Sequence, residues 1–125
     1  MKKLLWIGLA GVVGACARTF IAQLVHVESS FPFATFGVNM IGTFLLCFIT
    51  AGACRRLNVS KDLKDVVTTG FLGSFTTFSA FGMETVLLVE AGRLLWAILY
   101  VGCSILGALT IGMLGFHLGG KQVKE

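Results

Sequence analysis

Four apolar stretches, each long enough to cross a lipid bilayer, limit what this chain can fold into. They cover residues 4–25, 33–54, 66–91 and 94–118. A helix needs about 20 apolar residues to span the hydrocarbon core of a bilayer. Charged residues make up only 13% of the chain, against about 25% in soluble domains. We therefore predict an all-α membrane protein, with four transmembrane helices in one domain over residues 1–125.

The first stretch also has features of a secretion signal. Lys2 and Lys3 precede an apolar run, and residues 13–16 (VGAC) resemble a lipoprotein cleavage site. Because the apolar character continues past Cys16 and three more stretches follow, we favour a retained helix. The four cysteines have no C-x-x-C spacing, which favours small packed side chains over metal ligands or disulfides.

Residues 70–84, inside the third stretch, are a poor sequence for a regular helix. They read GFLGSFTTFSAFGME. Glycine costs roughly 1 kcal/mol relative to alanine in a helix, and serine and threonine offer the backbone competing hydrogen bonds. At membrane depth, irregular backbone is tolerated only where protein buries it or where it lines a cavity. We therefore predict that the third helix is broken in its middle, either at a helix crossing or beside a path for a solute or ion.

Polar side chains at membrane depth need partners. Asn39, one turn after Thr35, suits either a contact between helices or a contact with a solute. Arg18 lies beyond the middle of the first stretch, where it either snorkels to the far interface or faces a vestibule that attracts anions. Glu84 suits proton transfer or the anchoring of a helix end.

Phenylalanines recur with a helical spacing at Phe75, Phe78 and Phe81, between hydroxyl residues. Core packing explains such a stripe. The edge of an aromatic ring carries partial positive charge, so ring edges beside hydroxyl groups also suit an anion. The pattern leaves both interpretations open.

Small residues repeat every four positions in the fourth stretch, at Ser104, Ala108 and Gly112, and again at Gly115 and Gly119. This spacing lets helices approach closely in lipid. We interpret these residues as packing positions and not as a site.

Other classes of function find little support. His26 and His117 lie far apart, and no paired carboxylates or Cys/His pattern accompanies them, so we do not expect an enzyme. The formal net charge is +4, but the basic residues gather at the ends of the apolar stretches. We interpret them as topology signals, not as a nucleic-acid-binding face.

Taken together, these segments resemble the small bacterial fluoride channels of the Fluc family, over essentially the whole chain. Residues 70–84 are similar to the family's third-helix signature, and residues 11–18 (GVVGACAR) to its first-helix pattern G-x-x-G-A-x-x-R. Residues 35–42 (TFGVNMIG) are similar to its second-helix pattern. Tyr100 stands where the fourth helix of the family places an aromatic hydroxyl.

The resemblance implies an antiparallel dimer in the bacterial plasma membrane, which passively releases cytoplasmic fluoride through two pores. It implies that the broken third helices cross at the dimer interface, where backbone carbonyls of Gly73 and Thr76 hold a structural sodium ion. Ala80 and Gly82 stand where many relatives carry hydroxyls, which predicts that one pore is weaker or inactive. The expected fluoride-pore residues are Asn39, Phe78, Ser79, Phe81, Tyr100, Arg18, Thr35 and Glu84.

The basic residues are distributed unevenly between the two sides of the membrane. With four spans, both termini and the middle loop share one side, and the positive-inside rule predicts that this side is cytoplasmic. A homodimer with subunits in both orientations favours balanced loops. We therefore hypothesise an antiparallel heterodimer with an oppositely charged paralogue. Eight of the ten basic residues are on the terminal side: Lys2, Lys3, Arg55, Arg56, Lys61, Lys64, Lys121 and Lys124.

Two other functions remain open. The first is a proton-coupled exporter of the small multidrug type, also a four-helix dual-topology dimer, in which Glu84 would carry the proton. The second is a non-transporting helical subunit, which gives no reason for Asn39, Arg18 or residues 70–84.

Overall fold

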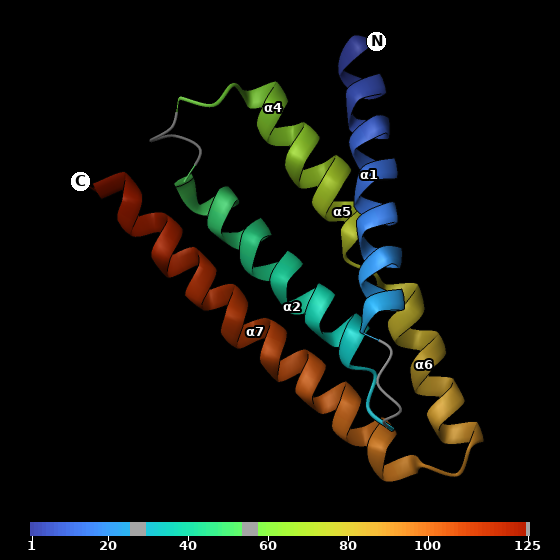
Figure 1. Ribbon diagram of the computed structural model, residues 1–125. Coiled ribbons are helices and arrows are strands. Elements are labelled where there is room, and N and C mark those ends of the chain that lie inside the picture. Colours follow the sequence, from blue (N-terminus) through green and yellow to red (C-terminus); the bar gives the residue numbers. More distant parts are fainter. Residues whose placement is uncertain (26–29, 54–57, 125) are drawn as a thin grey trace.

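A computed structural model describes residues 1–25, 30–53 and 58–124, and this part of the chain is built from helices (Figure 1). Four of its helices are long and apolar enough to cross a membrane, as the sequence predicts. The helical elements are α1 (Lys2–Leu24), α2 (Phe33–Phe48), η1 (Ile49–Ala53), α4 (Lys61–Asp65), η2 (Val66–Leu72), α5 (Gly73–Phe75), α6 (Phe78–Glu90) and α7 (Leu94–Lys124).

The helices run up and down, so that both termini and α4 lie at one end of the molecule (Figure 1). The turn between α6 and α7 lies at the other end (Figure 1). Gly92 forms this turn with a φ of 72°, a left-handed conformation that glycine adopts without steric cost. The start of α1, the start of α4 and the end of α7, which are far apart in the chain, thus lie at the same end of the molecule (Figure 1).

The third helix begins earlier than expected, at Lys61 instead of residue 66. Ser60 starts it, because the Ser60 hydroxyl accepts a hydrogen bond of 3.2 Å from the Leu63 N–H, the usual arrangement at a helix N-terminus. Lys3 of α1 fixes this end from outside, with its Nζ atom 2.6 Å from Asp65 and 3.0 Å from Asp62. Residues 61–65, which precede the apolar stretch at 66–91, are therefore part of the helix.

Close helix packing depends on glycines, as the small-residue spacing predicts. Helix α7 packs along α2 and η1, and α1 packs against η2 and α5. A Cβ atom added at Gly115 would lie 2.7 Å from the Phe44 carbonyl oxygen. One added at Gly14 would collide with the Phe71 carbonyl. At these glycines the backbones of neighbouring helices are in direct contact, and a larger side chain at either position would force the helices apart.

The third helix is interrupted between α5 and α6. Thr76 and Thr77 have extended backbone, with φ and ψ of −73° and 151° at Thr76 and −144° and 128° at Thr77. The interruption moves Phe75 away from Phe78 and Phe81, because Phe75 is buried and stacks on Phe71 at a centroid distance of 5.6 Å. The three phenylalanines therefore do not form the single helical stripe that their spacing suggests.

Candidate functional site at the interrupted helix

Asn39 of α2 holds the interruption in place. Its Nδ2 donates a hydrogen bond of 2.9 Å to the Thr77 carbonyl, and its Oδ1 accepts one of 2.8 Å from the Thr77 N–H. A primary amide carries both a donor and an acceptor, so one side chain replaces the two backbone partners that Thr77 would have in a continuous helix. Of the alternatives for Asn39, the structure shows a contact between helices.

Thr77 also starts the second half of the helix. Its hydroxyl oxygen accepts a hydrogen bond of 3.2 Å from the Ala80 N–H and lies 3.2 Å from the Ser79 hydroxyl. Threonine at this position satisfies one of the free N–H groups at the start of α6. Ser79 is exposed beside it.

The interruption releases backbone carbonyls from their helical partners. The Thr77 N–H, which would bond to the Gly73 carbonyl in a helix, donates to Asn39 instead. The Ala80 N–H, which would bond to the Thr76 carbonyl, donates to the Thr77 hydroxyl. The intervening Ser74 carbonyl accepts a 3.4 Å hydrogen bond from Arg18 Nε. Within the described part of the chain, the carbonyls of Gly73 and Thr76 thus lose their usual helical donors.

Arg18 therefore has a role that neither sequence interpretation described. Its guanidinium is half-buried and reaches from α1 to the interruption. The contact is long for a hydrogen bond, yet it places a positive charge beside the exposed carbonyls of the third helix.

A groove of about 350 Å³ runs along one side of the interruption. Phe78 projects at its edge with 83% of its surface exposed. The Phe78 and Phe81 rings lie 5.8 Å apart. The residues that line the groove are Asn39, Met40, Thr43, Leu46, Thr76, Thr77, Phe78, Phe81, Ser104, Ile105 and Ala108.

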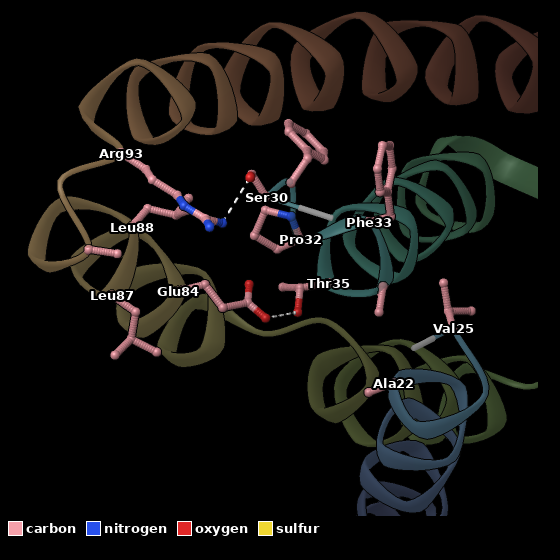
Figure 2. A pocket seen from close by; sticks show the side chains of 13 residues that line it. Ala22, Val25, Ser30, Pro32, Phe33, Thr35, Glu84, Leu87, Leu88 and Arg93 are labelled. Atoms are coloured by element: carbon pink, nitrogen blue, oxygen red, sulfur yellow. Dashed lines mark hydrogen bonds between the residues drawn. The ribbon is translucent and has the colours of Figure 1, made fainter. Parts of the chain in front are cut away.

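Glu84 lies in a second cavity, of about 400 Å³ (Figure 2). Its carboxylate accepts two short hydrogen bonds, both of 2.7 Å, from the Thr35 and Tyr100 hydroxyls. Tyr100 is completely buried, and its ring contacts that of Phe81 at a centroid distance of 5.1 Å. Phe81 also lines the groove. The Phe81–Tyr100 contact therefore separates the groove from the Glu84 cavity.

The structure thus divides the expected pore residues into neighbouring groups. Asn39, Phe78 and Phe81 share the groove, and Ser79 contacts its Thr77. Thr35, Glu84 and Tyr100 form the hydrogen-bonded cluster, and Arg18 binds the interruption from α1.

Sequence reasoning missed three polar residues of the groove, Thr43, Thr77 and Ser104. Ser104 was expected to serve only helix packing. Thr77 offered a usable signal, because a threonine three residues before Ala80 at a suspected helix break is typical of an N-cap.

These features define a small multi-pass membrane protein whose polar residues gather at an interrupted helix. Residues 5–116 match the model of the family described as CrcB-like protein, Camphor Resistance (CrcB). The chain belongs to this family, which confirms the resemblance seen in the sequence.

Similar proteins share almost their whole length with this chain. One of Bacillus thuringiensis subsp. konkukian, named fluoride-specific ion channel FluC 1, is 42% identical over 100% of this chain and 94% of its own. One of Desulfitobacterium hafniense, with the same name, is 39% identical over 90% of this chain and 97% of its own. One of Nitratidesulfovibrio vulgaris, named fluoride-specific ion channel FluC, is 40% identical over 95% of this chain and 98% of its own.

Proposed function

We propose that this chain is a subunit of a passive, fluoride-selective channel that exports cytoplasmic fluoride across the bacterial plasma membrane. The names of its full-length relatives support the ion. The observation that carries the proposal in the structure is the groove beside the interruption, where hydroxyls, one amide and two phenylalanine rings meet in an otherwise apolar helix bundle.

The chemistry of the groove suits a small, strongly hydrated anion. Such an ion crosses a membrane only where donors replace its water. Asn39 uses one of its two Nδ2 hydrogens for Thr77, and no other hydrogen bond of the described residues engages the amide nitrogen. The second hydrogen, the Ser104 hydroxyl and the edges of the Phe78 and Phe81 rings supply partial positive charge along the groove.

An antiparallel dimer would complete this pathway. The groove is open on one side, and Phe78 is 83% exposed at its edge. In hydrocarbon, the free carbonyls of Gly73 and Thr76 would be costly. A second subunit that crosses at the same interruption would cover both features, which favours the broken third helix as the centre of a dimer interface.

A structural sodium ion fits the same place. A hard cation prefers oxygen ligands, and the interruption frees the carbonyls of Gly73 and Thr76 from helical hydrogen bonds. The described residues contain no cluster of three His, Cys, Asp or Glu side chains, so backbone oxygens would be the ligands. When bound, the ion would neutralise the carbonyl dipoles of the two crossing helices.

The charge distribution favours a heterodimer. Figure 1 places both termini and α4 at one end, the end that carries Lys2, Lys3, Lys61 and Lys64. A chain with this bias inserts with that end in the cytoplasm. We infer that its antiparallel partner is a paralogue with the opposite bias.

Glu84 is the residue on which a proton-coupled exporter would depend. Hydrogen bonds from Thr35 and Tyr100 hold its carboxylate in one position. This arrangement favours Glu84 as a fixed structural group over a mobile proton carrier. If the chain is a channel, its fluoride flux does not depend on a pH gradient. If it is an exporter, its transport depends on the proton gradient, and Glu84→Gln abolishes this dependence.

Fluoride efflux from liposomes tests the proposal. Liposomes containing this chain alone should be compared with liposomes containing the chain and an oppositely charged paralogue, with chloride efflux as the control. Fast efflux of fluoride but not chloride supports the channel, and efflux without the paralogue shows that a homodimer suffices. Silence under both conditions contradicts the proposed function.

A further inference from the structure

Arg93 lines the cavity that contains Glu84 (Figure 2). Arg93 is exposed, whereas Glu84 is half-buried, so the Arg93 charge lies nearer the solvent opening of the cavity. Two hydrogen bonds fix its position: Nη1 donates to the Ser30 hydroxyl at 2.8 Å, and the backbone N–H donates to the Leu88 carbonyl at 2.8 Å. The Ser30 bond orients the guanidinium, and the backbone bond fixes the turn that carries Arg93.

The charges that line this cavity, among the residues that the structure describes, are those of Arg93 and Glu84. The Glu84 carboxylate accepts hydrogen bonds from the Thr35 and Tyr100 hydroxyls. Without Arg93 the lining would be net negative and would repel an incoming anion. With Arg93 at the opening, the first charge that an anion meets is positive.

We propose that Arg93 attracts fluoride into the Glu84 cavity and so sets the rate at which anions enter the pathway from this end. The inference rests on the proposed channel function. A cleft with one sign of charge at its opening raises the local concentration of oppositely charged solutes and their rate of entry. The Phe81–Tyr100 ring contact separates this cavity from the groove, so an anion collected by Arg93 arrives one aromatic layer from the groove.

The test is the single-channel fluoride current of Arg93→Gln at two ionic strengths. The Debye length is about 10 Å at 0.1 M and about 3 Å at 1 M, so the attraction acts at low salt and is screened at high salt. We expect the current to fall roughly two- to fivefold at about 0.1 M and to match the wild type at about 1 M. Arg93→Lys, which keeps the charge, should retain most of the current at both.

Glu90→Gln is the matched control. Glu90 ends α6 two residues before the Gly92 turn and is exposed, but it does not line the cavity. If Arg93 acted only through the general surface charge of this end, Glu90→Gln would raise the low-salt current by a similar factor. We expect it to have little effect.

Chemical modification of the Arg93→Cys variant restores the positive charge and so distinguishes a loss of attraction from a folding defect. In Arg93→Cys, a cationic thiol reagent should recover the low-salt current and an anionic reagent should reduce it further, within the same folded sample. The wild type treated with the same reagents controls for its own cysteines. A conducting wild type with an unchanged Arg93→Gln current at about 0.1 M overturns the inference, whereas a wild type without fluoride current overturns the channel function itself.

Discussion

The Asn39 side chain and the Thr77 peptide group form a closed pair of hydrogen bonds, 2.9 Å from Nδ2 to the carbonyl and 2.8 Å from the N–H to Oδ1. The pair lets the third helix leave helical geometry at membrane depth without two unsatisfied polar groups. It also fixes Asn39 at the side of the groove, next to the Phe78 and Phe81 rings. One amide thus serves both the backbone and the proposed ion path.

Removal of this amide should damage both functions. In Asn39→Ala the Thr77 N–H and carbonyl lose their partners, and each unsatisfied buried group costs about 1–3 kcal/mol. We expect lower thermal stability and at least a roughly tenfold loss of fluoride efflux, or about 1.4 kcal/mol on the barrier, while the dimer still assembles. Melting in detergent, size-exclusion chromatography and liposome efflux measure the three effects.

Thr110→Ala is a suitable control, because the Thr110 hydroxyl bonds only to the Leu106 carbonyl of its own helix. It should change neither stability nor efflux appreciably. Asn39→Asp separates the two bonds of the pair, since a carboxylate still accepts from the Thr77 N–H but cannot donate to its carbonyl. Normal efflux from Asn39→Ala would remove the residue from the proposed pathway.

Phe78 and Phe81 should respond differently to the same substitution. Phe78 is 83% exposed at the edge of the groove, whereas Phe81 packs against Tyr100 and the buried residues around it. We expect Phe78→Ile to reduce fluoride efflux roughly tenfold with unchanged stability. Phe81→Ile should reduce efflux and also cost about 1 kcal/mol of stability. Phe116→Ile, exposed on α7, is the control, and wild-type efflux from both groove variants would contradict the role of the rings.

Local signals in the sequence were sufficient for the number of spanning helices. Apolar length predicts the four spans, although the third begins after the Ser60 cap, at Lys61, and not at residue 66. These features depend on residues close together in the chain. The irregular composition of residues 70–84 indicates a break, but the exact place depends on Asn39, 38 residues away.

Features that depend on contacts between distant segments could not be predicted from the sequence. A spacing of three predicts that Phe75 faces the same way as Phe78 only if the helix continues between them, and Thr76 and Thr77 interrupt it. The bonds from Thr35 and Tyr100 to Glu84 join three helices. Individual polarity identifies such residues as candidates, whereas their grouping depends on packing between distant segments.

Gly42 should be essential because of where α2 passes the interruption. A Cβ atom at Gly42 would collide with the Thr76 side chain, whose hydroxyl is held by a 2.9 Å bond to the Leu72 carbonyl. We expect Gly42→Ala to displace Thr76, to lower the free energy of unfolding by about 1–3 kcal/mol and to reduce efflux. Gly37→Ala on the same helix is the matched control, because nothing lies within 4 Å of its added Cβ. Equal behaviour of the two variants would show that the close approach is unimportant.

The proposed sodium site makes the protein sensitive to the cation in solution. If the Gly73 and Thr76 carbonyls hold the ion, the purified dimer should melt several degrees higher in sodium than in a large organic cation such as N-methyl-D-glucamine, because a ligand of the native state stabilises it by mass action. The same exchange should lower fluoride efflux after prolonged incubation. Identical melting curves and identical efflux in both salts would contradict the site.

The orientation of the chain in the membrane is the final prediction, and it decides between a homodimer and a heterodimer. We expect reporter tags at either terminus to be cytoplasmic in nearly all molecules, because the terminal end carries most of the basic residues. As a control, neutralising Lys61, Lys64, Lys121 and Lys124 to glutamine should weaken the bias and produce a mixed population. If the unaltered chain already inserts equally in both orientations, a homodimer can form from it alone and the need for an oppositely charged paralogue disappears.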